Sequence, residues 1–92
     1  MKVRNMTDSR GNQVPNQFEI HADEGVYFQS YKTVIAFIPL GYGPDAKTQL
    51  DERMWDCSVT TSKYRNQFLR ETTKETKAKI ASSEYALTDL NA

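Results

Sequence analysis

The chain has 92 residues with a formal net charge of zero, and 38% of them are hydrophobic. This length suits one domain with one core, and the composition excludes an intrinsically disordered chain, which would be poor in apolar residues and highly charged. The longest apolar run, VIAFIPL at residues 34–40, is far shorter than the about 20 residues of a membrane-spanning helix, and the first residues lack the apolar segment of a signal peptide.

We therefore expect a single domain over residues 1–92 with no membrane segment. The only cysteine, Cys57, cannot form a disulfide within the chain, whereas small secreted domains usually contain several such bonds. Together these features predict a cytoplasmic protein.

The first half of the chain has the period of two that is typical of strands. Residues 2–6 can form a short strand, and the turn-forming cluster at residues 8–12 ends it. In the next segment, NQFEIHA, apolar side chains alternate with polar ones, and the apolar set is Phe18, Ile20 and Ala22. This alternation predicts a strand whose apolar face is buried.

Two further strands are expected after a short hairpin connection at residues 23–25. In VYFQSY, residues 26–31, aromatic rings fall on both faces of the predicted strand. Residues 34–38 are apolar throughout, which is typical of a central strand that is covered on both faces. Such a strand needs something to pack over its second face.

The second half changes to a helical period after a loop at residues 40–47 and a short returning strand at residues 48–52. From Thr61, apolar side chains recur at helical spacing over about three turns. The sequence TTKE at residues 72–75 fits a capping box and predicts the start of a second helix. The apolar side chains of the first helix are Tyr64, Phe68 and Leu69.

Alternation returns in EYALTDL, residues 84–90, and predicts a closing strand. Strands and helices are thus segregated along the chain, which indicates an α+β fold. We expect a small antiparallel sheet with two short helices on one face and a closing C-terminal strand.

No catalytic or metal-binding pattern stands out. The single histidine, His21, lies on an alternating strand without a nucleophile pattern, and one histidine with Cys57 cannot complete a tetrahedral metal site. The carboxylate pairs at residues 23–24 and 51–52 point to opposite strand faces or solvate a turn, and GYG at 41–43 lacks the rest of a phosphate-binding loop. We therefore predict a protein that is not an enzyme and has no catalytic residues, metal or cofactor.

The densest polar segment is SVTTSKYRNQFL, residues 58–69. A structural interpretation is that one hydroxyl caps the helix, the apolar side chains enter the core and the other polar side chains face water. A functional interpretation starts from the surplus hydroxyls, because they and the free amides of a helix N-terminus suit a phosphate or carboxylate. Neighbouring Lys and Arg side chains would add charge-assisted contacts.

The basic side chains extend this second interpretation. Residues 57–81 carry six basic and two acidic side chains, a local excess of four positive charges that can attract a polyanion. We expect a non-enzymatic binding protein that contacts nucleic acid or another polyanion through the helix beginning near Thr61. The expected contact residues are Thr60, Thr61, Lys63, Arg65, Arg70, Lys74 and Lys77.

The alternative is a protein-interaction module, either a modulator of a host protein or a self-associating accessory protein. Tyr and Trp dominate the hot spots of protein interfaces, although aromatic rings in a chain of this length are also typical of the core. A small-molecule pocket between the sheet and the helices is a third possibility. The candidate interface residues are Tyr27, Tyr31, Tyr42 and Trp55.

Two motifs carry a resemblance to a known group of proteins. The chain resembles small uncharacterised proteins of phages, plasmids and other mobile elements that share an SYxTxVAxI strand followed by SxTTxK and Tyr or His at a helix start. The group has no assigned activity, so the resemblance implies a phage or bacterial setting and no mechanism. The matching residues here are Ser30, Tyr31, Thr33, Ile35, Ala36, Ser58, Thr60, Thr61, Lys63, Tyr64 and Phe68.

Overall fold

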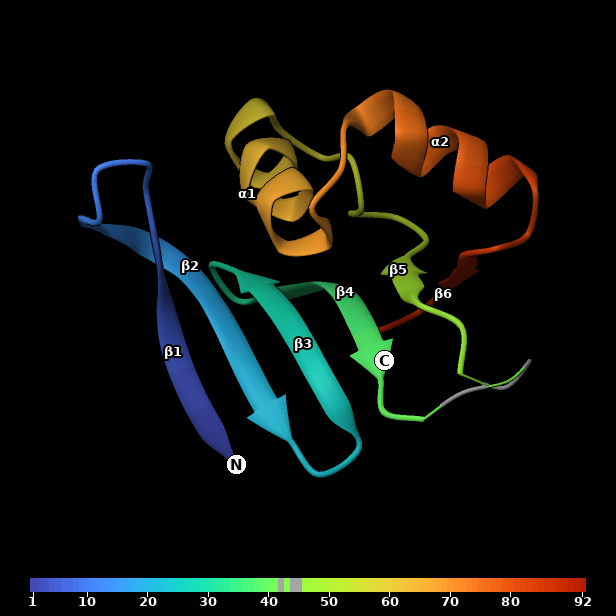
Figure 1. Cartoon of the computed structure of the whole chain (residues 1–92), viewed down its shortest axis with the longest axis horizontal. Coiled ribbons are helices and arrows are strands. Elements are labelled where there is room, and N and C mark those ends of the chain that lie inside the picture. Colours follow the sequence, from blue (N-terminus) through green and yellow to red (C-terminus); the bar gives the residue numbers. More distant parts are fainter. Residues whose placement is uncertain (42, 44–45) are drawn as a thin grey trace.

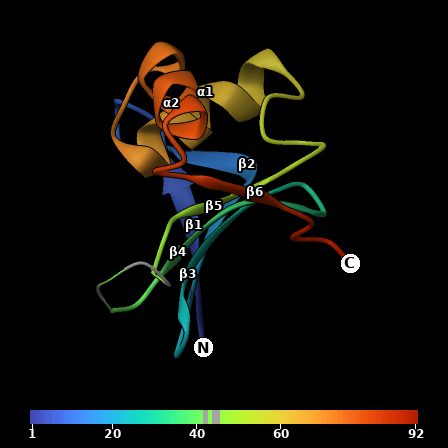
Figure 2. The same ribbon diagram turned by 90° about the vertical axis from the view of Figure 1, so that its right-hand side faces the viewer.

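The computed structural model describes residues 1–41, 43 and 46–92, and it has the expected α+β architecture (Figure 1). The elements in chain order are β1 (Lys2–Thr7), β2 (Gln13–Ala22), β3 (Gly25–Ser30), β4 (Thr33–Pro39), β5 (Gln49–Asp51), α1 (Val59–Leu69), α2 (Thr73–Ala81) and β6 (Ala86–Thr88). The six strands form one sheet, and both helices lie on the same side of it (Figure 2).

The sheet is a meander with one crossover. Its strand order follows the chain from β1 to β6, and each neighbouring pair is antiparallel except β5 and β6, which are parallel. A parallel pair requires a long connection, and here α1 and α2 supply it. The closing strand predicted from residues 84–90 is therefore confirmed as β6. Its parallel pairing explains why both helices come between β5 and β6 in the sequence, although these strands are neighbours in the sheet.

The core lies between the helices and one face of the sheet. Phe28, Ile35 and Leu50 have no solvent exposure, and Tyr64 of α1 is buried against them. The ring of Phe68 stacks on that of Phe28, with 5.6 Å between centroids. Burial of this apolar surface contributes about 25 cal/mol per Å² to folding, so Tyr64 and Phe68 help to hold α1 on the sheet.

Local signals determine where the helices begin. The Ser58 hydroxyl accepts a hydrogen bond from the Thr61 amide at 3.1 Å, which caps α1. Before α2, Thr72 and Glu75 make both halves of a capping box. Each hydrogen bond satisfies an amide that would otherwise lack a partner, so both predicted caps are confirmed. Helix α1 ends where Arg70 adopts a left-handed conformation with φ of 58°.

Candidate functional site

The pairing of the strands divides their side chains between two faces. Phe28 faces the helices, because its ring stacks on α1. Its neighbour Tyr27 therefore points to the opposite side, as do Ile20 and Phe37, which lie directly across from Tyr27 on β2 and β4. We call this side of β1–β4 the uncovered sheet face, and its apolar side chains are Val3, Phe18, Ile20, Ala22, Tyr27, Val34 and Phe37.

An aromatic pair forms the centre of the uncovered sheet face. The rings of Tyr27 and Phe37 stack with centroids 4.3 Å apart and an interplanar angle of 23°. Gly25 adopts φ of +152°, and a side chain there would meet the Ile38 carbonyl and lie 2.7 Å from Cε1 of Phe37. Only glycine therefore lets the Phe37 ring settle against the backbone. Phe37 is only 9% exposed although neither helix covers it.

No charged side chain of β1–β4 lies on the uncovered sheet face. These strands carry three charged residues, Lys2, Arg4 and Glu19, and all three are on the helix side. Glu19 lies across from Phe28, Arg4 lies across from Glu19, and Lys2 lies across from His21. A helix layer normally packs on apolar side chains. In the β1–β2 hairpin, however, the charged side chains lie on the helix side and most of the apolar ones lie on the other.

The charged side of the hairpin borders a groove beyond the last turn of α1. The groove has a volume of about 540 Å³ and includes Arg70 from the end of the helix. Glu19 and His21 line it, with 3.2 Å between Glu19 Oε1 and His21 Nε2. Water reaches these groups because α1 ends before it covers them, so the groove explains how a helix-side strand face can hold charged residues.

Of the four aromatic residues predicted as an interaction surface, the three that the structure describes lie in different places. Tyr27 lies on the uncovered sheet face, and its hydroxyl donates a hydrogen bond to Glu24 at 3.1 Å. Desolvation is the largest cause of the raised pKa of Tyr27, and the hydrogen bond to Glu24 is the next. Tyr31 is 59% exposed in the turn before β4, whereas Trp55 packs against the core. Tyr42 lies outside the described residues. The structure therefore does not bring Tyr27, Tyr31 and Trp55 together on one surface, and contact with a protein through them stays a prediction.

The alternation in β2 predicts that Phe18 and Ile20 are buried, and the continuous apolar run predicts the same for residues 34–38. In the structure Phe18, Ile20 and Val34 are only partly buried. In the described residues neither helix lies over this set. The signal that identifies the face is the apolar central strand, whose second side needs a cover.

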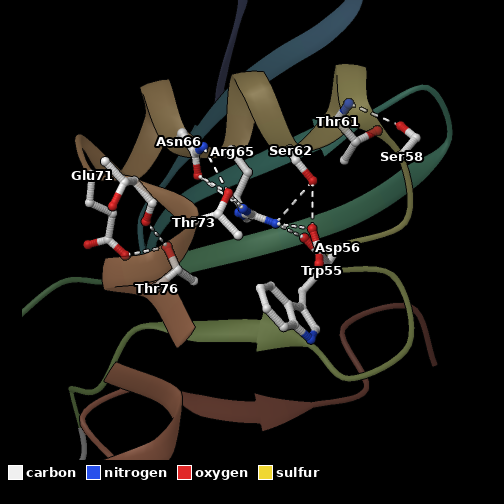
Figure 3. A network of polar contacts seen from close by, with 11 residues as sticks. Trp55, Asp56, Ser58, Thr61, Ser62, Arg65, Asn66, Glu71, Thr73 and Thr76 are labelled. Carbon is white, nitrogen blue, oxygen red and sulfur yellow. Dashed lines mark hydrogen bonds and ion pairs between the residues drawn. The ribbon is translucent and has the colours of Figure 1, made fainter. Parts of the chain in front are cut away.

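Arg65 does not belong to an exposed polyanion site, because it is fully buried. One guanidinium nitrogen donates to the Trp55 carbonyl at 2.5 Å and lies 3.2 Å from Asp56 Oδ1 (Figure 3). The other donates to Asn66 Oδ1 at 3.0 Å and to Thr73 Oγ1 at 2.8 Å. A planar group with several donors can be buried when carbonyl, carboxylate and hydroxyl oxygens surround it, and that is the reason for this correction.

The Arg65 network also changes the electrostatics of the loop before α1. The pKa of Asp56 is lowered first by the hydrogen bond that Ser62 donates at 2.8 Å, and then by the bond and the charge of Arg65. Because the lowered pKa keeps Asp56 ionised, the buried Arg65 charge is paired with a carboxylate that is partly open to water. Arg65 thus joins α1, the start of α2 and the loop at residues 55–56.

Thr61, like Arg65, cannot belong to an exposed polyanion site. Its side chain is buried, and its hydroxyl lies 2.9 Å from the Ser30 hydroxyl, so it joins α1 to β3. The remaining predicted contacts are exposed, and two of them lie at opposite ends of α1. Lys63 borders a shallow depression at the start of α1, whereas Arg70 borders the groove at its end. The other exposed members are Thr60, Lys74 and Lys77.

A second buried network lies between the helices and β6. The Glu71 carboxylate accepts hydrogen bonds from Lys79 at 2.8 Å, Tyr85 at 2.6 Å and Thr76 at 2.5 Å. Burial alone would raise the pKa of Glu71, but these bonds outweigh it and the pKa is lowered. Burial and the bond to Glu71 raise the pKa of Tyr85 to about 12. This network is a structural connection between α2 and the chain leading into β6.

Among residues 1–41, 43 and 46–92, no group of three or more His, Cys, Asp or Glu side chains could hold a metal ion. Neither helix of that part is long and apolar enough to cross a membrane.

Comparisons with known proteins identify the family of the chain. No curated protein and no solved structure matches the chain. The model of a family of unknown function, DUF8033, matches residues 1–84, which contain β1–β5 and both helices and end just before β6. Because the match extends over most of the 92 residues, the chain belongs to DUF8033, a family of unknown function.

Proposed function

We propose that this protein is a non-enzymatic binding protein and that the uncovered sheet face contacts another protein. The observation that carries the proposal is an apolar face without charged residues on β1–β4, over which neither helix lies. The resemblance described above adds a setting, which is a phage, a mobile element or a bacterial host.

The composition of this face supports association with a protein. Val3 is 59% exposed and Tyr27 is partly exposed, with Ile20 between them on the sheet. Phe37, which is only 9% exposed, stacks on the Tyr27 ring and holds it in place. Aromatic residues are enriched in interfaces, and burying apolar surface is the main favourable contribution to most protein association. Rigid rings also lose little conformational entropy when a partner covers them. A polyanion would find no cation on this face.

Photo-crosslinking tests the proposal in cells. Benzoylphenylalanine in place of Tyr27 is expected to give covalent protein adducts after illumination, because a partner lies over that ring. The matched control carries the same residue in place of Val59, which is 89% exposed at the start of α1, on the other layer of the molecule. Mass spectrometry identifies the adducts. Absence of adducts at position 27, or equal adducts at both positions, would reject this function.

A second candidate is polyanion contact through the helix layer. It is supported by four exposed cations on or next to the helices, whereas Glu75 is the only exposed acidic residue between positions 59 and 81. The set without the buried Thr61 and Arg65 consists of Thr60, Lys63, Arg70, Lys74 and Lys77.

Fluorescence anisotropy with labelled DNA and RNA at two salt concentrations tests this second candidate. Phosphate contacts release counterions, so affinity should fall steeply with salt. A Lys63→Ala, Lys77→Ala double variant should bind more weakly than the wild type and show a shallower salt dependence. If the wild type does not bind at low salt, polyanion binding is rejected.

A further inference from the structure

We propose that the partner on the uncovered sheet face is a second copy of this chain, so that two sheets pack face to face. This inference rests on the proposed function, because it uses the same surface and names its occupant.

Charge favours a second copy as the occupant. The three charged residues of β1–β4 all point to the helix side. A charged group of a partner would therefore lose its water at this face and find no opposite charge to pair with. The partner surface must therefore be apolar and uncharged, and a second uncovered sheet face has these properties. The chain has zero net charge, so two copies meet without overall electrostatic repulsion.

The size of the face is consistent with the centre of a dimer interface. Four strands about 4.8 Å apart, with about six residues each at about 3.3 Å per residue, give a flat footprint of about 400 Å². A standard interface buries about 800 Å² on each partner, with an apolar centre and a polar rim. Tyr31 and the turn at residues 23–24 lie beside the footprint and can supply that rim.

The sequence pattern gives a further reason. The alternation in β2 and the apolar run in β4 both predict burial on this side, and in two-sheet proteins such side chains interdigitate with those of a second sheet about 10 Å away. In a two-fold dimer the same patch serves both partners, so one set of apolar positions provides both surfaces. The exposed edge of the sheet is a poorer site for pairing, because β1 carries Lys2 and Arg4.

The test is the molar mass of the purified full chain by sedimentation equilibrium, measured from low to high micromolar concentration. A reducing agent is included because Cys57 is exposed and could link two copies. The wild type should approach about twice 10.6 kDa. Ile20→Glu, which places a carboxylate in each half of the interface, should raise the dimer dissociation constant by about a hundredfold or more.

Two variants make the result specific. Val59→Glu introduces the same charge on the helix layer and should leave the dimer intact. Val3→Glu repeats the test at an exposed position of the face, in case Ile20→Glu does not fold by circular dichroism. A wild type that stays monomeric at every concentration overturns the inference, as does a dimer that Ile20→Glu and Val59→Glu weaken equally.

The crosslinking result separates this inference from the proposed function. Adducts of the position-27 variant with another protein, together with a monomeric wild type, would leave the function standing and reject the second copy as occupant. Adducts of twice the chain mass would support both. Absence of any adduct together with a monomeric wild type would reject both.

Discussion

Arg65 places a positive charge inside the molecule, where an unpaired ion is very costly. Its guanidinium reaches in two directions, towards the loop at residues 55–56 and towards Thr73, and its centre lies 5.0 Å from the Trp55 ring. A single ammonium group cannot bridge both sides. The side chain that would be the best anion contact on the surface therefore serves to hold the helix layer together.

Arg65→Lys should lower the free energy of unfolding by about 2 to 3 kcal/mol, because the lysine keeps the charge but leaves several buried oxygens without donors. Urea denaturation followed by circular dichroism measures the change. Lys63→Ala, an exposed position on the same helix, should change stability by less than about 0.5 kcal/mol. Equal stability of Arg65→Lys and the wild type would contradict the structural role.

Gln17 is the opposite case, since it is fully buried and neither its Nε2 nor its Oε1 has a hydrogen-bond partner. It lies across from Ser30 on the helix side of the sheet. An unpaired amide in this position reduces stability, because it loses its bonds to water on folding.

Gln17→Met should raise the free energy of unfolding by about 1 kcal/mol, because methionine has a similar shape and no polar group that needs a partner. Thermal and urea unfolding measure the gain. Gln13→Met, at an exposed position of the same strand, serves as the control. A loss of stability in Gln17→Met would mean that the amide has a partner, such as an internal water.

At the scale of elements, the Glu71 carboxylate is the main contact between α2 and the chain that enters β6. Lowering a carboxyl pKa on folding means that the ionised form stabilises the folded state. This contribution is fully present above the unfolded pKa, near the ordinary value of 4.5, and is lost as the pH falls through the lower folded value.

The melting temperature should therefore fall on acidification below about pH 4.5, and Glu71→Gln should be less stable at neutral pH with a smaller loss on acidification. Thermal unfolding between neutral pH and pH 3 tests this. Glu84→Gln is the control, because its side chain is 62% exposed and should contribute less than about 0.5 kcal/mol at neutral pH. An unchanged pH profile in Glu71→Gln would contradict the prediction.

The helices and strands could be predicted from the sequence because local signals mark them. Contacts between residues that are distant in the sequence could not be predicted in this way. Ser58 and the Thr72–Glu75 box mark the helix starts through bonds to amides within three residues. By contrast, burial of Arg65 depends on oxygens from three separate segments, and the parallel pairing of β6 depends on how the helices pack. The alternation in β2 correctly divided its side chains between two faces, but alternation cannot state which face the helices choose.

At the scale of the whole molecule, residues 90–91 connect two strands of the sheet, β4 and β5, through hydrogen bonds. Asn91 accepts a bond from the Val34 amide at 2.8 Å and donates one to the Val34 carbonyl at 2.9 Å, as a neighbouring strand would. The Asp51 carboxylate accepts from the amides of Met54 and Leu90. Residues 90–91 therefore tie the ends of β4 and β5 together.

A chain that ends at Thr88 should lose about 1 to 3 kcal/mol of unfolding free energy, because the buried Asp51 carboxylate and the Val34 backbone would lose these partners. Urea denaturation compares it with a chain that ends at Asn91 and keeps every one of these bonds. If the two chains have the same stability, the C-terminal bonds do not contribute.

The parallel pairing of β5 and β6 has a consequence for the order of folding. Strands β1–β5 are neighbours along the chain, whereas β6 meets β5 only after residues 52–85 have formed the helix layer. Contacts between distant residues form late because loop closure comes first. Native-state hydrogen exchange should therefore show that the amides of Glu52 and Ala86, which join β5 and β6, open with a lower free energy than those of β3. The β1–β5 meander would then form before β6 locks the helix layer in place.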